Sequence, residues 1–261
     1  MQAQLGLVGT GMLGGAIARR LLAAGYVAPD GLILANRSGS AKGFEDWPGI
    51  RIVTDMQALA DECDTILLAV PPAAAAGLRI EAGNSLVVSV MAGVSLAQLS
   101  AMTGSPHVVR AMSSPAAEIG LAYSPWTAAE AVNADDRSVV SALFSACGTT
   151  DEVSDESQIE CFTALTGPVP GFVAFFAYAM VRYAVEAGID ERIATRAIRQ
   201  LFRAGGTMLA EGEMTPADHV QEMVDYAGTT AAGLVAMQEL GISDLIAKGL
   251  DAAVEKTRSI A

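Results

Sequence analysis

The stretch Leu5-Gly6-Leu7-Val8-Gly9-Thr10-Gly11-Met12-Leu13-Gly14 decides the fold of this chain. Residues 5–8 form a short apolar run, and apolar residues return at helical spacing from Ile17 to Leu22. The pattern therefore predicts a strand, a turn and a helix. The turn has the form G-x-G-x-x-G, and its place between a strand and a helix is typical of a dinucleotide phosphate loop. A glycine-rich turn without a ligand is the alternative interpretation.

The three glycines each have a physical role in such a loop. Gly9 permits the tight turn, Gly11 lets the backbone approach a pyrophosphate, and Gly14 lets the helix pack on the strand. Free N–H groups at the start of the helix, from Gly11, Met12 and Leu13 onward, face the anion.

Further strands are expected where short apolar runs recur, and helix-compatible segments at 56–62 and 96–102 separate them. The expected strands are 32–35, 52–53, 65–70, 86–90 and 107–110. Strands that are apolar throughout and alternate with helices predict a parallel sheet covered on both faces. The fold class expected here is α/β, with a Rossmann-type, doubly wound parallel sheet.

The pattern changes after about residue 150, where no strand run recurs. Helices are expected at 172–187, 191–211, 216–226 and 229–260, with breaks at Gly188, Gly212 and Gly241. The acidic segment 151–160 is expected to join the two regions. We therefore predict a dinucleotide-binding domain at residues 1–152 and an all-helical domain for dimerisation and substrate binding at residues 153–261.

The residues after the second strand indicate which nicotinamide cofactor is used. NAD-binding folds place a carboxylate there for the ribose 2′-hydroxyl, whereas an arginine accommodates the 2′-phosphate of NADP. This chain has Asn36-Arg37-Ser38, which supply a cation and a hydroxyl and no carboxylate. NADPH is favoured over NADH. The alternative is that Arg37 is a solvated turn residue.

Composition excludes several classes of protein. The 261 residues carry a net charge of −13, which disfavours binding to nucleic acid or to anionic membranes. The three cysteines are too few and too scattered for a disulfide framework, and no secretory signal is recognised, so a cytoplasmic location is expected. The uncharged stretch 161–181 is interrupted by two prolines and two glycines, so we expect a helix buried against a partner rather than a membrane span.

The sequence does not indicate a metal site or a catalytic nucleophile. His107 and His219 are far apart and lack a metal-ligand spacing, so no metal site is expected. The arginines at 192, 196, 199 and 203 recur at about one helical turn and indicate a solvated or interface face.

Several motifs together resemble the pyrroline-5-carboxylate reductases, the NAD(P)H-dependent enzymes that form proline. The generic ones are the glycine turn, Asn36-Arg37-Ser38, 64–71 (DTILLAVP) and 89–95 (SVMAGVS); the more diagnostic ones are 109–112 (VRAM), 163–167 (TALTG) with Pro170, and 227–234 (AGTTAAGL). The resemblance implies an active site between the cofactor domain and a homodimer interface made by the C-terminal helices. It places cofactor contacts at the glycine turn, residues 36–38, Ala69, Val70, Pro71, Met91, Ala92, Gly93 and Ser114.

The resemblance also implies that Gly228, Thr229 and Thr230 receive the substrate carboxylate. Small residues with free N–H groups at a helix start suit an anion. The alternative is that the two threonines only cap the helix.

The chain departs from the family pattern at three places. A family Asn that helps to place the nicotinamide becomes Ser114, and the family's Ser-Gly-Ser-Gly-Pro-Ala-Tyr becomes residues 166–172 (TGPVPGF). A family serine that would donate to a carboxylate becomes Asp225. Because two carboxylates repel each other, we expect either a cyclic imine without the usual carboxylate or Asp225 acting as a proton donor. The alternative is that Asp225 is an N-cap that never contacts substrate.

The expected function is NADPH-dependent reduction of the C=N bond of a cyclic imine. Candidate proton donors and catalytic residues are Asp225, Tyr226, Thr166 and Thr230. Two alternatives stay open: reduction of a small keto compound, and a nucleotide-binding sensor without catalysis.

Overall fold

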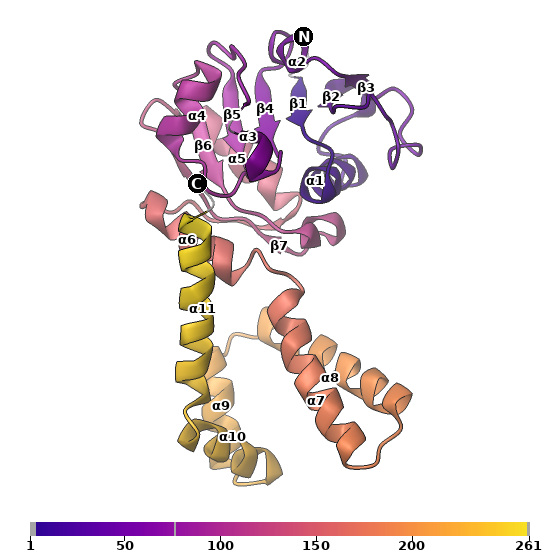
Figure 1. Cartoon of the computed structure of the whole chain (residues 1–261), viewed down its shortest axis with the longest axis vertical. Helices are drawn as coiled ribbons and strands as arrows, with labels where there is room; N and C mark the ends of the chain where they lie inside the picture. Colours follow the sequence, from indigo (N-terminus) through magenta and orange to yellow (C-terminus); the bar gives the residue numbers. More distant parts are fainter. Residues whose placement is uncertain (1–3, 76, 260–261) are drawn as a thin grey trace. The chain divides into compact units, whose positions relative to one another are not determined.

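One β-sheet forms the centre of the first part of the chain in the computed structural model, which describes residues 4–75 and 77–259. Its strands are β1 (Leu5–Val8), β2 (Leu32–Ala35), β3 (Arg51–Val53), β4 (Thr65–Leu68), β5 (Leu86–Ser89), β6 (Val108–Ala111) and β8 (Trp126–Ala128). Across the described residues these seven strands are ordered β3-β2-β1-β4-β5-β6-β8 (Figure 1). Neighbours are parallel except β6 and β8. The expected Rossmann-type sheet is confirmed, and an antiparallel edge strand completes it.

Successive residues of a strand point to opposite faces of the sheet, and helices cover both of these faces. Leu7 is packed in a cluster with Ile17 of α1 (Met12–Ala23), whereas Val8 belongs to a second cluster with Leu59 and Leu99. Leu59 lies in α2 (Met56–Ala60) and Leu99 in α4 (Leu96–Thr103). The fully apolar strands are therefore explained by two buried faces.

The other elements are a set of helices and short strands that follow in chain order. They are η1 (Pro29–Gly31), α3 (Pro72–Ala75), η2 (Pro115–Ile119), β7 (Ala122–Tyr123), α5 (Ala134–Ser145), β9 (Gly148–Thr149), α6 (Glu156–Leu165), α7 (Gly171–Glu186), α8 (Glu191–Glu211), α9 (Pro216–Asp225), α10 (Thr229–Glu239) and α11 (Ile242–Arg258). Strands β7 and β9 form a separate parallel pair.

The sequence predicts that the acidic segment 151–160 only links the two regions, but its second half is helical. Asp155 accepts a hydrogen bond from the amide of Ser157 and caps α6, which begins at Glu156 and packs against β6 and β8. Hydrogen bonds from Ser157 lower the pKa of Asp155, so its carboxylate stays charged at the helix start. The break expected at Gly241 within residues 229–260 is confirmed: Gly241 has a φ of +71°, and it separates α10 from α11.

Contacts group the chain into two units. Unit 1 comprises the chain up to Pro168 together with the segment from Ala253, and unit 2 comprises Val169–Ala252. Helix α6 and the last part of α11 are thus grouped with the sheet. The boundary expected between residues 152 and 153, as a division of function, stays a prediction.

Unit 2 leaves most of its apolar side chains uncovered. Helix α7 packs on α8, and α9 packs on α10. No side chain of α7 is buried, and Phe175, Tyr178 and Tyr183 are 67%, 63% and 75% exposed. Helix α7 has 16 residues, and in the described part of the chain no helix combines the length and apolar character that crossing a membrane requires.

Candidate functional site

The glycine turn after β1 has the geometry that its residue types predict. Gly9 has a φ of +98°, and its amide donates to the carbonyl oxygen of Ala35 at 2.9 Å. A Cβ at Gly9 would lie 2.7 Å from the carbonyl oxygen of Ala69, and one at Gly14 would lie 2.0 Å from the carbonyl oxygen of Gly9. Both positions therefore require glycine, one for its backbone angle and both for space.

The start of α1 is open. Gly11 is the N-cap residue of α1, and no side chain of the described residues caps the helix there. A Cβ at Gly11 would meet no described atom within 4 Å, and the neighbouring Met12 is 79% exposed. The first amides of a helix have no partner within the helix, so this end presents donors and a positive dipole to an anion. The arrangement fits a pyrophosphate, and the openness above Gly11 provides the approach.

The ends of the central strands lie at the same edge of the sheet. Val8 is in register with Ala35 of β2 on one side and with Leu68 of β4 on the other, and Leu68 is in register with Ser89 of β5. The segments that follow these strands hold the residues predicted to contact cofactor: Gly9–Gly14, Asn36–Ser38, Ala69–Pro71 and Met91–Gly93. The fold brings these four segments to one edge, which is where doubly wound sheets bind ligands.

The loop after β2 is braced by Asn36. Its Oδ1 accepts from Ser38 Oγ at 3.1 Å and from the amide of Ser40 at 3.2 Å, and its Nδ2 donates to the carbonyl oxygen of Ser40 at 3.0 Å. Arg37 is exposed, and no hydrogen bond or ion pair joins its side chain to the described residues. A fixed loop with an uncommitted guanidinium is suited to a phosphate group.

The other predicted cofactor contacts follow β4, β5 and β6. The amide of Ala69 donates to the carbonyl oxygen of Val8 at 2.8 Å. Met91 is buried, and its amide donates to Ser89 Oγ at 3.2 Å. Ser114 is 1% exposed and is the N-cap residue of η2, without a cap bond from its side chain. Its role as a cofactor contact stays a prediction.

Thr166 is the C-cap residue of α6 in unit 1. It is half-buried, and its Oγ1 donates to the carbonyl oxygen of Phe162 at 3.0 Å. The hydroxyl proton is bonded to this carbonyl oxygen, and the lone pairs of the hydroxyl oxygen are free to accept a hydrogen bond. In this geometry Thr166 is suited to accept a hydrogen bond, and its catalytic role stays a prediction.

The turn between α9 and α10 holds the other predicted catalytic and substrate residues, all in unit 2. Asp225 ends α9, and its Oδ1 accepts from Gln221 Nε2 at 2.8 Å. The next residues, Tyr226 and Ala227, lead into Gly228, which is the N-cap residue of α10. Tyr226 is 82% exposed, and Thr229 and Thr230 are the first residues of α10.

This geometry overturns two of the alternatives stated above. Asp225 is not an N-cap, because it closes the preceding helix, and the threonines do not cap α10, because Gly228 holds that position without a side-chain bond. The N-terminus of α10 therefore presents uncapped amides beside two hydroxyl groups.

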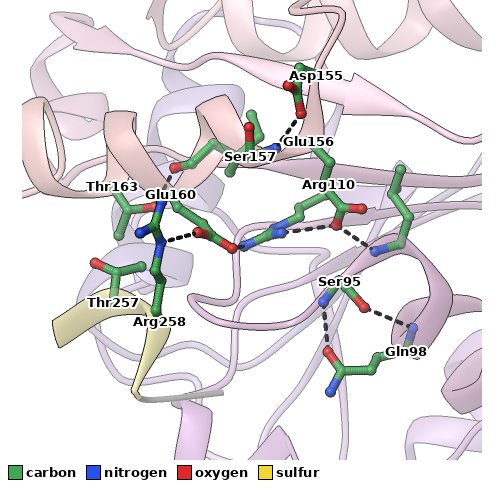
Figure 2. A network of polar contacts seen from close by, with 12 residues as sticks. Ser95, Gln98, Arg110, Asp155, Glu156, Ser157, Glu160, Thr163, Thr257 and Arg258 are labelled. Carbon is green, nitrogen blue, oxygen red and sulfur yellow. Dashed lines mark hydrogen bonds and ion pairs between the residues drawn. The ribbon is translucent and has the colours of Figure 1, made fainter. Parts of the chain in front are cut away.

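A network of charged residues was not foreseen from the sequence (Figure 2). Arg110 of β6 is 4% exposed, and its Nη1 donates to Glu156 Oε1 at 2.9 Å. The same oxygen accepts the amide of Leu96 at 2.8 Å. Glu160 Oε1 lies 4.0 Å from Arg110 Nη2, and its Oε2 accepts from Arg258 Nε at 2.9 Å. Arg110 is part of the diagnostic motif 109–112, but nothing in the sequence pairs it with residues so far along the chain.

Comparison with known proteins identifies two segments by family. The model "Pyrroline-5-carboxylate reductase dimerisation" matches residues 156–260, and "NADP oxidoreductase coenzyme F420-dependent" matches residues 4–93. The chain is 29% identical to a pyrroline-5-carboxylate reductase of Synechocystis, covering 100% of this chain and 99% of that protein. It is 28% identical to one of Vibrio alginolyticus, covering 98% and 97%.

Solved structures share the fold. A pyrroline-5-carboxylate reductase of Coxiella burnetii has a TM-score of 0.87 at 23% identity, covering 100% of this chain and 99% of that one. A pyrroline carboxylate reductase of Plasmodium falciparum, solved with NADP bound, has a TM-score of 0.81 at 21% identity, covering 99% and 98%. The glycine turn, the helical C-terminal segment and the full-length similarity agree, and the chain resembles the pyrroline-5-carboxylate reductases over its whole length.

Proposed function

We propose that this protein is an NADPH-dependent reductase that acts on the C=N bond of a cyclic imine. The observation that carries the proposal is the uncapped start of α1 behind Gly9 and Gly11, at the edge where four strands end. Its relatives are named pyrroline-5-carboxylate reductases, and one related structure was solved with NADP. A bound reduced nicotinamide supplies the hydride in such a reaction.

The glycine turn and the loop after β2 bind different parts of the cofactor in this proposal. The amides at the start of α1 bind the pyrophosphate, and Gly11 leaves room for it. Arg37 and Ser38 bind the 2′-phosphate, so NADPH is preferred to NADH. Ala69–Pro71, Met91–Gly93 and Ser114 complete the cofactor contacts in this proposal.

The substrate side of the proposal rests on the turn between α9 and α10. Gly228, Thr229 and Thr230 offer amide and hydroxyl donors to a polar group of the ring. Asp225 lies at the other end of the turn, where the negative end of the α9 dipole adds to its charge. Two like charges about 4 Å apart repel by about 4 kcal/mol at an effective dielectric constant of about 20.

Asp225 therefore changes the substrate that this turn accepts. We infer that the ring lacks the carboxylate that the family's substrate carries, or that Asp225 gives the proton to the imine nitrogen. Tyr226 and Thr230 are the other candidate donors, and Thr166 could donate only if it released its hydrogen bond to the carbonyl oxygen of Phe162. Gln221 keeps the Asp225 carboxyl group in one orientation through its hydrogen bond.

The proposed assembly is a homodimer or larger oligomer through the C-terminal helices. Unit 2 exposes large apolar side chains along α7 and α8, including Phe175, Phe176, Ile193 and Leu201. An apolar surface of this kind is typical of a protein interface. We place the protein in the cytoplasm, where the free thiols of Cys63, Cys147 and Cys161 stay reduced.

NADPH consumption with matched substrates tests the proposal. The wild type and Asp225→Ser are each assayed with 1-pyrroline and with its 5-carboxylate, with small keto acids as a third class. We expect the wild type to prefer the ring without carboxylate, and Asp225→Ser to gain activity on the carboxylated ring. Preference of the wild type for the carboxylated ring contradicts the substrate inference, and activity on keto acids alone contradicts imine reduction.

A further inference from the structure

Glu156 joins two segments that the cofactor proposal uses. Its Oε1 accepts the amide of Leu96, which begins α4 directly after the loop of residues 91–95. The same oxygen accepts Arg110 Nη1 from β6, the strand that leads into residues 112–114 (Figure 2). One carboxylate oxygen therefore ties together the segments that follow β5 and β6.

Glu156 is the main hydrogen-bonding partner of the Arg110 guanidinium among the described residues. Arg110 is 4% exposed, so its guanidinium needs a counter-charge inside the protein. Glu160 comes only to 4.0 Å, a distance too long for a hydrogen bond, and Arg110 Nε has no partner among the described residues. Without Glu156 the buried cation keeps no direct hydrogen-bonded carboxylate, and leaving a buried charge in that state is strongly unfavourable.

The bond to Leu96 fixes the start of α4. The side chain of Ser95 already caps this helix and accepts the amide of Gln98 at 3.2 Å, while Gln98 accepts the amide of Ser95 at 2.8 Å. The amide of Leu96 is not part of that reciprocal capping and is taken by Glu156. The loop of residues 91–95 is therefore fixed at its far end by a side chain from α6.

We propose that Glu156 is a positioning residue for the nicotinamide cofactor. It holds the loop of residues 91–95 and the segment of residues 112–114 at one spacing, acting through Leu96 and Arg110. The inference rests on the proposed function, in which Met91–Gly93 and Ser114 contact the cofactor. Pre-set spacing matters because displacements of about 1 Å at a binding loop cost much of its affinity.

A pair of variants at Leu96 tests the tether through a single hydrogen bond. Leu96→Pro removes the N–H group, and Leu96→Ala keeps it, while both lose the leucine side chain. Proline is tolerated at this first helical position, and Ser95 has the extended conformation that a residue before proline requires. We expect the Kd for NADPH to be about tenfold higher in Leu96→Pro than in Leu96→Ala.

Variants at Glu156 and Glu160 test the carboxylate itself. We expect Glu156→Ala to raise the Kd and KM for NADPH about tenfold with a smaller change in kcat, and Glu156→Gln, which keeps an acceptor oxygen, to restore part of the loss. Glu160→Ala is the matched control, since Glu160 contacts the same network but not α4. We expect it to change the Kd by less than twofold.

The outcomes separate this inference from the proposed function. Absence of NADPH binding by the wild type overturns both. Normal binding by the wild type with an equal Kd in Glu156→Ala and Glu160→Ala overturns the positioning role alone. If Glu156→Ala does not fold, the Leu96 pair decides: equal Kd values for Leu96→Pro and Leu96→Ala overturn the inference, and a higher Kd in Leu96→Pro supports it.

Discussion

A Cβ on Gly14 would stand 2.0 Å from the carbonyl oxygen of Gly9. The first turn of α1 is thus pressed against the turn that leaves β1. We expect Gly14→Ala to destabilise the protein by about 1–3 kcal/mol, since the backbone of Gly9 has to move. Urea unfolding measures this change, and a loss below about 0.5 kcal/mol would show that the close approach is not retained in solution.

Gly11→Ala is expected to behave differently. A methyl group at Gly11 meets no described atom within 4 Å, so stability should change by less than about 1 kcal/mol. The methyl group fills the space through which the pyrophosphate approaches, so NADPH binding should weaken at least tenfold. Calorimetric titration of both glycine variants compares the effects. Unchanged affinity in Gly11→Ala contradicts the assignment of the turn to the pyrophosphate.

Arg37→Gln should alter the choice between cofactors. The loss of the cation should weaken NADPH about tenfold and leave NADH unchanged, because only NADPH carries the 2′-phosphate. Lys42→Gln is the control, an exposed cation in the same loop. Binding of both nucleotides is measured for both variants at one salt concentration. An equal loss for NADPH in the two variants would mean that only net charge matters.

Ala227 occupies a backbone conformation that favours glycine. Its φ is +55°, and its amide donates to the carbonyl oxygen of Val224 in the last turn of α9 at 3.0 Å. A residue other than glycine in this region strains the folded backbone by about 1–2 kcal/mol. Glycine removes that strain, but it also makes the unfolded chain more flexible, which offsets part of the gain in stability.

We therefore expect Ala227→Gly to stabilise the protein by about 1 kcal/mol. Ala236→Gly, inside α10, should destabilise it by a similar amount. Thermal unfolding of the two variants gives the signs. A loss of stability in Ala227→Gly would contradict the left-handed turn.

Two thiols are expected to be inert in the folded protein. Burial raises the pKa of Cys63 and of Cys147 from about 9 to about 11 in each case. Thiol reagents attack the thiolate, so at pH 8 at most one thiol per chain, that of the exposed Cys161, should react before unfolding. All three should react in urea. Rapid labelling of Cys147 in the native protein, detected by mass spectrometry, would contradict its burial.

The same two thiols give stability a dependence on pH with a defined sign. Because the folded-state pKa values are raised, the contribution is complete below about pH 9 and is lost as the pH rises through about 11. The urea midpoint should fall over that range. The urea midpoint of Cys147→Ala should fall less steeply with pH than that of the wild type. Equal slopes for the two proteins would mean that other groups cause the loss of stability.

Much of the sheet was predictable because its signals are local. Gly9, Gly11 and Gly14 lie within one turn, and β1, β2, β4 and β5 are apolar runs buried on both faces. The edge strand β8 was missed because it is three residues long and pairs antiparallel through Trp126. Helix α5 was missed although Asn133 and Asp136 form a capping box, a signal present in the sequence.

The sequence indicates candidate site residues only where they are close together along the chain. Asn36, Arg37 and Ser38 are predicted from their place after the second strand, and their role as cofactor contacts stays a prediction. Glu156 was not found, because its partners Leu96 and Arg110 lie in other elements and only the folded chain brings them to one oxygen atom. Long-range ion pairs of this kind carry no periodic signal.

Direct titration of the purified protein with NADPH, with NADH in parallel, tests the central claim that the turn at Gly9–Gly14 holds a dinucleotide. We predict saturable binding of one NADPH per chain, with weaker binding of NADH. Absence of binding for both nucleotides would contradict it.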